Sequence, residues 1–277
     1  MPRTCLIHAV LIAALAASLR SSAVTRGGEP ASPPPPASPR AIVNVIHVKD
    51  PQADQWLKRI EHKSRDVKTL AANLRYDRNN GLTGSKQRRF GTLQYTAGPP
   101  ARFAIYFDRL LTGRRPVQQN RWYVYDGQWL VEKQEDQKLF VKHRVAVPDP
   151  ANPGRHRDPL ALGEGPFPVP VGQRREEIVK RFNVRVMAPT EEDPANTVRL
   201  RLEPKPGHRI DFTYIDLWYD RDTLLPRRVY AVDHDSQDEM VVDLSEMTIN
   251  TPIAAAVFDT TAPSERGERG WREEINP

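Results

Sequence analysis

The stretch that most constrains the fold is residues 120–141, NRWYVYDGQWLVEKQEDQKLFV. Aromatic and β-branched residues fill two runs of this stretch, and Asp126-Gly127 separates them. An Asp-Gly pair between two such runs is a strong β-hairpin signal, because both central residues of a type I′ turn need a positive φ. The sequence therefore predicts an antiparallel ribbon with a type I′ turn, to which residues 138–145 add a third strand. Both faces of this ribbon carry aromatic residues, so we expect apolar groups to cover each face.

The N-terminal residues 1–23 have the pattern of a secretory signal. Arg3 precedes an apolar run from Leu6 to Leu19, and Ser21-Ser22-Ala23 supplies the small residues of a cleavage site. A spanning helix would need roughly 20 apolar residues, so we expect a cleaved signal and an exported, soluble chain in the periplasm or cell envelope. The only cysteine, Cys5, lies inside the signal, so a mature protein without disulfides has to be stabilised by a hydrophobic core.

Residues 24–49 form an expected proline-rich linker, because the run GGEPASPPPPASPR at 27–40 favours polyproline II. The formal net charge of the whole chain is +6, and Arg3 and Arg20 of the signal contribute two of these charges. The remaining excess is spread along the chain, so nucleic acid is not an expected partner. We expect a monomer with one domain over residues 50–263 and a polar tail over 264–277.

The domain begins with an expected amphipathic helix and then changes to a period of two. Asp50 occupies an N-cap position, Pro51 the first turn, and Trp56 and Ile60 share one face. A second short helix is expected at residues 174–182. Strands are expected at residues 67–77, 86–95, 102–111, 183–188, 197–203, 209–220, 225–233, 239–248 and 256–260. Sequential strands of this kind favour a barrel or a strongly bent antiparallel sheet.

The proline-rich segment 148–172 interrupts the strands. A loop of this length is uncommon in a compact domain unless it is functional or disordered. Leu160, Leu162 and Phe167 are too apolar for a solvated linker. We therefore expect a lid that docks on the sheet together with Trp56 and Ile60 of the first helix.

Four segments resemble the LolA-like family of periplasmic lipoprotein carriers. Residues 93–103 (LQYTAGPPARF) resemble an apolar strand, a proline turn and a following aromatic of that family, and residues 125–130 (YDGQWL) resemble its Asp-Gly hairpin. Residues 198–204 (VRLRLEP) resemble a strand that ends in proline, and residues 258–263 (FDTTAP) resemble the terminal strand. One departure concerns lid control: the family has an arginine before the turn proline, where this chain has Gly98.

The resemblance implies a mainly β (α+β) fold, an incomplete antiparallel β-barrel of about 11 strands with short helices that form a lid. It also implies an apolar cavity for the acyl chains of a lipid or lipoprotein, with envelope membrane proteins that load and unload it. The candidate cavity residues are Leu93, Tyr95, Phe103, Ile105, Phe107, Trp122, Trp129, Phe140, Phe212, Leu217 and Val241. The alternative for each of these residues is packing in a solid core. The alternative for the protein is an envelope sensing or scaffold module that binds a protein partner.

Motifs for catalysis are absent from the sequence, which has no G-x-S-x-G, no H-E-x-x-H and no glycine-rich phosphate loop. We therefore expect a non-catalytic protein with no cofactor and no metal. The acidic stretch 233–239 lacks the glycine and glutamate of a calcium loop and is interpreted as a solvated hairpin tip. The pairs Arg88-Arg89 and Arg114-Arg115 could contact lipid phosphates or an acidic partner, but they are interpreted as solvated charges beside turns.

Overall fold

The computed structural model describes residues 50–145, 159–163, 170–208, 210–264 and 270–276. All of them belong to one compact unit, residues 45–277. The expected signal and linker, Phe167, and residues 148–158 of the expected lid lie outside the described residues. No helix within the described ranges is both long and apolar enough to span a membrane.

The main feature is a sheet of 12 strands in the order β12-β6-β5-β4-β3-β2-β1-β11-β10-β9-β8-β7. Its first six strands along the chain are β1 (Thr69–Asn79), β2 (Lys86–Thr96), β3 (Arg102–Thr112), β4 (Arg115–Tyr125), β5 (Trp129–Gln134) and β6 (Leu139–Arg144). The next five are β7 (Phe182–Met187), β8 (Thr197–Pro204), β9 (Phe212–Asp220), β10 (Pro226–Asp233) and β11 (Glu239–Ile249). Strands β1 to β11 pair antiparallel, and β12 and β7 form the two edges, so the expected incomplete β-barrel is confirmed.

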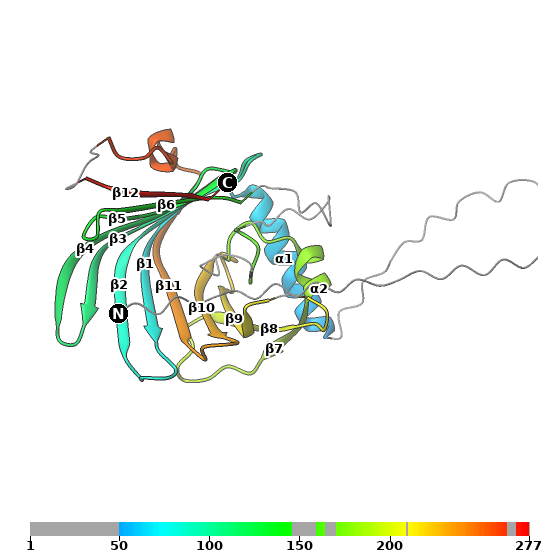
Figure 1. Cartoon of the computed structure of the whole chain (residues 1–277). Coiled ribbons are helices and arrows are strands. Elements are labelled where there is room, and N and C mark those ends of the chain that lie inside the picture. The colour runs from blue at the N-terminus through cyan, green and yellow to red at the C-terminus, as the bar shows by residue number, and fades with distance from the viewer. Residues whose placement is uncertain (1–49, 146–158, 164–169, 209, 265–269, 277) are drawn as a thin grey trace, which may run out of the picture. The chain divides into compact units, whose positions relative to one another are not determined.

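Two helices lie on the side toward which the sheet bends (Figure 1). In α1 (Pro51–Asp66), Asp50 Oδ1 accepts hydrogen bonds from the backbone N–H groups of Gln52 and Ala53, at 2.9 and 3.2 Å, as expected for an N-cap. The other oxygen, Asp50 Oδ2, accepts a 2.9 Å hydrogen bond from Val186 N of edge strand β7. The shorter α2 (Arg175–Arg181) runs directly into β7. Asp50 therefore joins the start of α1 to one edge of the sheet.

The other edge is formed by β12 (Arg272–Asn276), which pairs parallel with β6. All five residues of β12 are exposed, and Trp271 lies between the ammonium groups of Lys133 and Lys138, 5.0 and 5.2 Å from its ring centroid. This strand belongs to the segment expected to be a polar tail. The segment is polar, and it nevertheless covers the backbone edge of β6.

The turn at Asp126-Gly127 differs from the expected type. Only Gly127 of the pair has a positive φ, of 103°. Asp126 Oδ1 instead accepts hydrogen bonds from the backbone N–H groups of Gln128 and Trp129, both at 2.8 Å. The hairpin is confirmed, but the type I′ turn was wrong. The Asp126 side chain satisfies the turn amides, so Asp126 itself does not need a positive φ.

The segment expected as a last strand contains the 3₁₀ helix η1 (Ala255–Phe258) instead. Phe258 packs with Ala104 and Val124 on the face of β3 and β4 that points away from the main core. Thr260 then donates a 2.7 Å hydrogen bond from its hydroxyl to Asp126 Oδ2. On this outer face, the apolar cover that was expected for the aromatic hairpin is therefore supplied by η1, a segment of the same chain.

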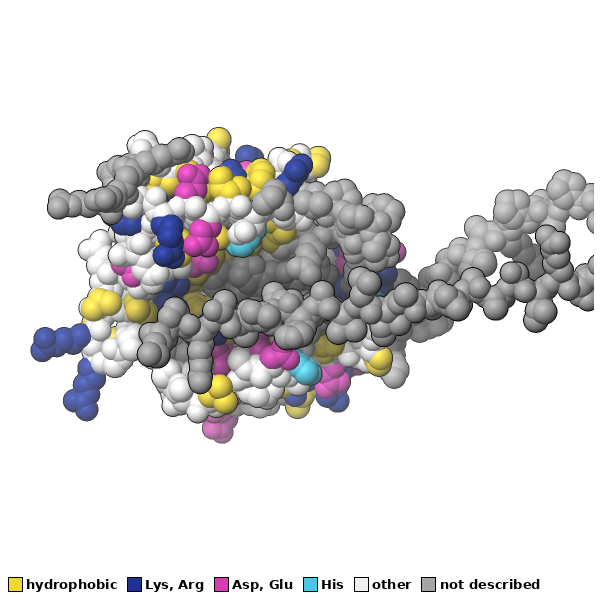
Figure 2. All heavy atoms as spheres, in the orientation of Figure 1, with side chains coloured by type: hydrophobic (Ala, Val, Ile, Leu, Met, Phe, Trp, Pro, Cys, Tyr) yellow, Lys and Arg dark blue, Asp and Glu magenta, His cyan; other side chains and the backbone are white. Residues whose placement is uncertain are grey.

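Ion pairs between neighbouring strands follow the outer face of the sheet. Asp216 is 0% exposed and binds both Arg199, at 2.6 Å, and Arg201, at 2.7 Å. Asp243 likewise pairs with Arg75 and Arg228. In the space-filling view, basic and acidic side chains are intermixed over the visible part of the described surface (Figure 2). Opposite charges on adjacent strands support the strand register of this face.

Candidate functional site

The candidate site is the concave face of the sheet, where seven of the eleven expected cavity residues lie. On β2 and β3, Leu93 pairs with Ile105 and Tyr95 with Phe103, and Phe107 follows at the same strand parity. Phe212 and Leu217 extend this surface on β9. All seven side chains are at most 4% exposed and belong to one hydrophobic core. These residues share one face because alternate residues of a strand point to the same side, and their role as a cavity lining stays a prediction.

The other four expected cavity residues lie on the opposite face, which corrects their assignment. Trp122 stacks on Tyr106 with ring centroids 4.9 Å apart and packs beside Phe258. Trp129 lies 4.9 Å from Lys142 Nζ, on the outer side of β5. Phe140 pairs with Lys133 and shares the outward parity of Lys142, and Val241 alternates with core residues of β11. Strand parity alone could not tell which face of the hairpin points inward, because η1 makes the outer face apolar as well.

The concave face is covered by α1 and by the described part of the proline-rich segment. Ile60 is 4% exposed and Trp56 packs partly buried against the core. Leu160 and Leu162, which are 6% and 0% exposed, enter the same core. Gln173 Nε2 donates hydrogen bonds to Leu160 O at 2.7 Å and Val171 O at 3.3 Å. Gln173 thus ties the described parts of this segment to each other, and the burial of Leu160 and Leu162 places them in the core. Their role as a lid stays a prediction.

A pocket of about 590 Å³ opens between α1, α2 and the end of β2. Its lining comprises Glu61, Ser64, Arg65, Lys68, Tyr95, Ala97, Gly98, Gly172, Gln173, Arg174, Arg175 and Glu176. Tyr95 belongs both to this pocket and to the apolar core, so the pocket reaches the concave face. Gly172 has a φ of +73°, and a Cβ atom on it would lie 2.4 Å from the Tyr95 hydroxyl oxygen. A glycine is therefore required where the covering segment passes Tyr95.

The concave face also carries polar groups that the sequence did not single out as a site. Tyr123 donates a 3.0 Å hydrogen bond from its hydroxyl to Glu132 Oε1, and Arg121 donates one of 2.6 Å to Gln134 Oε1. Burial, reinforced by the negative charge of Glu132, raises the pKa of Tyr123 to about 12. Strand alternation separates Arg88 from Arg89: Arg88 pairs with Asp77 on the outer face, and Arg89 lies on the concave face. The interpretation as a solvated charge was therefore wrong for Arg89, whereas the side chain of Arg88 stays 43% exposed beside its ion pair.

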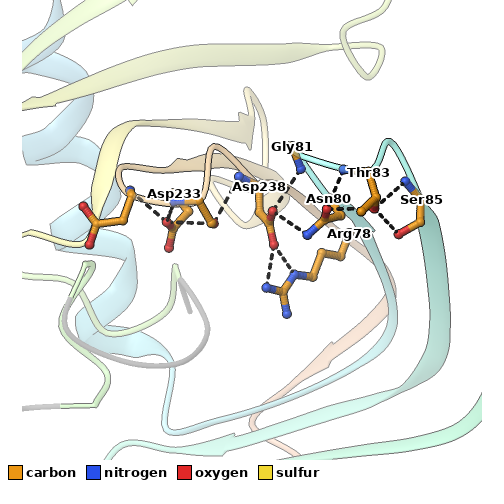
Figure 3. A network of polar contacts seen from close by, with 9 residues as sticks. Arg78, Asn80, Gly81, Thr83, Ser85, Asp233 and Asp238 are labelled. Atoms are coloured by element: carbon orange, nitrogen blue, oxygen red, sulfur yellow. Dashed lines mark hydrogen bonds and ion pairs between the residues drawn. The ribbon is translucent and has the colours of Figure 1, made fainter. Parts of the chain in front are cut away.

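The acidic turn between β10 and β11 is a structural clamp (Figure 3). Asp238, only 1% exposed, accepts hydrogen bonds from Asn80 Nδ2 at 3.1 Å and Gly81 N at 3.0 Å and pairs with Arg78 at 2.5 Å. Burial by itself would raise the pKa of Asp238, but the hydrogen bond from Gly81 and the Arg78 guanidinium outweigh it and hold the pKa below its usual range. The turn was expected to be a solvated tip, and Asp238 instead ties it to the turn between β1 and β2.

The fold and site together define an open antiparallel sheet whose apolar concave face is covered by helices and a loop. No family model and no curated protein matches the sequence. The chain is similar in structure to a DUF1329 family protein from Desulfovibrio piger, at 14% identity and a TM-score of 0.38 over 76% of this chain and 98% of that chain.

Two further solved structures share this level of similarity. One is a LolA superfamily protein from Nitrosomonas europaea, at 9% identity and a TM-score of 0.36 over 75% of this chain and 97% of that chain. The other is MucB in the MucA/MucB complex of Pseudomonas aeruginosa, at 16% identity and a TM-score of 0.37 over 75% of this chain and 60% of that chain. The LolA superfamily that the sequence resembles is thus among these structures, and what this chain binds has to be inferred from its own residues.

Proposed function

We propose that the protein is an exported, non-catalytic carrier that binds the acyl chains of a lipid or lipoprotein against the concave face of its sheet. The observation that supports this most is the cover of that face. A second sheet does not cover it within the described residues; α1 and the short segment around Leu160 and Leu162 do. Elements this small can move aside while the strand pairing that holds the sheet together stays intact.

In this mechanism the acyl chains take the place of the covering side chains. Leu57 and Ile60 of α1 and Leu162 of the loop would leave the core, and acyl methylenes would contact Ile105 and Phe107 in their stead. Each buried methylene contributes about 0.8 kcal/mol, so two or three acyl chains more than offset the lost contacts. The pocket beside Tyr95 is the proposed entrance, since it reaches the core between α1 and α2.

The proposed location is the periplasm or cell envelope, and it depends on the signal pattern of residues 1–23 and not on the described fold. The proposed partners are the acylated cargo and the envelope membrane proteins that load and unload it. The protein is expected to act as a monomer, because one sheet supplies the whole acyl-binding face.

The test measures uptake of a fluorescent fatty acid by purified mature protein, together with native mass spectrometry for co-purified lipid. Ser64→Trp places a large side chain in the pocket from α1, whereas His62→Trp adds the same side chain at an exposed position of α1 that does not line the pocket. We expect stoichiometric uptake, slowed at least about tenfold by Ser64→Trp and unchanged by His62→Trp, since only the former narrows the entrance.

Two results would count against this proposal. If folded protein neither carries lipid nor takes up the fatty acid, acyl binding is wrong. If both tryptophan variants take up the probe at the rate of the unchanged protein, the pocket is not the entrance. Circular dichroism of each variant establishes that the fold is retained.

Binding of a protein partner is a second candidate, and the pairing of β12 supports it. The parallel addition of β12 to β6 indicates that this edge accepts an extended segment, with Trp271 held between two lysines. A partner strand could add at the same edge by β-augmentation. Capture of a partner by protein that lacks residues 265–277, but not by the whole chain, would favour this function.

A further inference from the structure

An aromatic row with two arginines beside it lies on the concave face. Phe107 of β3 lies between Tyr76 of β1 and Tyr123 of β4, with ring centroids 6.0 and 6.3 Å away. Arg121 pairs directly with Phe107 across β3 and β4. Arg89 pairs with Tyr76 across β1 and β2 and shares the inward parity of Gly91, which pairs with Phe107. The two arginines thus flank Phe107 from the strands on its two sides.

These arginines are not fully satisfied by the protein. Within the part of the chain that the structure describes, Arg89 makes no hydrogen bond and no ion pair, and the Nε atoms of both Arg89 and Arg121 are buried without a partner. Arg121 is 15% exposed and lies 3.8 Å from the one carboxylate in its contacts, that of Glu132. Native proteins rarely leave such donors unpaired, and buried charges are normally paired.

Electrostatics adds a second reason for an anion at this place. Burial lowers the pKa of Arg89, and the positive charge of Arg121 lowers it further, so the charged form of Arg89 is disfavoured by both. A negative group beside the two guanidinium groups would offset both effects by favouring their charged forms. Guanidinium groups bind carboxylates and phosphates with two parallel hydrogen bonds, which is their strongest contact.

We propose that Arg89 and Arg121 bind the anionic end, a carboxylate or a phosphate, of the acyl-bearing ligand, while Phe107 contacts its first methylenes. This inference rests on the proposed function and narrows the cargo to anionic amphiphiles. The acyl chain then runs along the concave face toward Ile105 and Phe103, which continue the inward parity of Phe107 on β3.

The test compares laurate with methyl laurate, which has the same chain without the charge, in binding to purified mature protein. The variant Arg89→Met removes the charge and keeps the length of the side chain. The control Arg114→Met makes the same change of net charge at an exposed turn. We expect laurate to bind about 10- to 100-fold more tightly than the ester. Arg89→Met should lower this preference at least several-fold, since only Arg121 remains to bind the anion, with a smaller effect on the ester than on laurate, and Arg114→Met should keep the preference.

Equal affinities of laurate and its ester for the unchanged protein would overturn the anion site and leave acyl binding standing. Equal weakening of both ligands by Arg89→Met would also overturn it, because it would indicate a packing role. Inorganic phosphate is the third probe. Phosphate binding that requires Arg89, without binding of laurate or its ester, would support the anion site and overturn the carrier function. Absence of binding by all three probes would overturn both.

Discussion

At the scale of single residues, buried charge in this protein follows two opposite arrangements. Asp238 and Asp216 are almost inaccessible; Arg78 and the Gly81 amide satisfy Asp238, and Arg199 and Arg201 satisfy Asp216. Arg89 also has a buried nitrogen, but it lacks a protein partner among the described residues. Fully satisfied buried charges support a particular structure, whereas an unsatisfied one marks a place where a ligand can contribute.

The substitution Asp238→Asn should destabilise the fold by about 1–3 kcal/mol, because it removes the ion pair with Arg78 and weakens the acceptor for Gly81. The folded-state pKa of Asp238 lies below the ordinary value of 3.8. Its contribution to stability is therefore fully present above that value and is lost as the pH falls through the lower folded pKa.

Urea denaturation between about pH 2 and pH 7 measures both effects, since the acid loss of stability spans the folded and unfolded pKa values. The variant should lose part of the acid dependence of the unchanged protein. The control is Asp235→Asn, whose side chain is 98% exposed in the same turn. An acid dependence of Asp238→Asn as steep as that of the unchanged protein would exclude Asp238 as the responsible group.

At the scale of elements, the start of α1 and the end of the chain both protect edges of the sheet. Asp50 caps α1 and accepts from β7, and β12 lies along β6. Unprotected strand edges can pair with other molecules, so such covers matter for solubility. Each of these covers can be removed separately.

Replacing Asp50 with alanine should cost about 1–2 kcal/mol, because the helix loses its cap and β7 loses the acceptor for Val186 N. Thermal and urea denaturation measure the loss. Asp66→Ala, at the opposite end of α1, should cost nothing or stabilise slightly, because a negative charge is unfavourable at a helix C-terminus. Equal losses in the two variants would contradict a specific role of Asp50.

Removing residues 265–277 should leave the secondary structure unchanged and make the protein self-associate as its concentration rises. The reason is that β12 contributes only exposed side chains, while its loss bares the backbone of β6. Analytical ultracentrifugation of the truncated and whole chains measures this. The control is Ile275→Ala, which keeps the strand and should stay monomeric. If the truncated chain also stays monomeric, β12 does not protect the edge.

The elements differ in how far the sequence predicts them. The period of two locates β1 to β3 to within a few residues, and the cap at Asp50 fixes the start of α1, since both signals are local. Which face of β4 points inward depends on η1, more than a hundred residues later in the chain, so Trp122 was assigned to the wrong face. The polar β12 carries no apolar alternation at all. Arg89 was considered for contact with lipid phosphates but interpreted as solvated, and Arg121 was missed, because side-chain pairing depends on strand register and not on composition.

At the scale of the whole domain, the proposed function requires α1 to move relative to α2 and the sheet. The ion pair between Asp54 and Arg175, at 2.5 Å, joins the two helices beside the pocket. Cys5 is the only cysteine and lies in the expected signal, so an engineered pair in mature protein would be unique.

Combining Asp54→Cys with Arg175→Cys and bridging the thiols with a short bismaleimide should slow fatty-acid uptake at least about tenfold, because the helices can no longer separate. The unbridged double variant should take up the probe at least as fast as the unchanged protein, since it lacks the ion pair. Stopped-flow fluorescence measures both rates. Bridged protein that loads as fast as the unbridged form would show that the helices need not part.

The Asp50 carboxylate accepts hydrogen bonds from both α1 and β7, and this affects every state in which α1 moves away from the sheet. If the first helix swings away, the Val186 amide loses its acceptor at the moment when apolar side chains meet water. A protein that has released its ligand and is still open would therefore expose two kinds of group to other molecules: apolar side chains of the concave face and an unpaired backbone N–H of β7. Release of the ligand should accordingly be fastest at a partner surface that contacts the apolar side chains and accepts a hydrogen bond from the Val186 amide. Release into buffer should be slower.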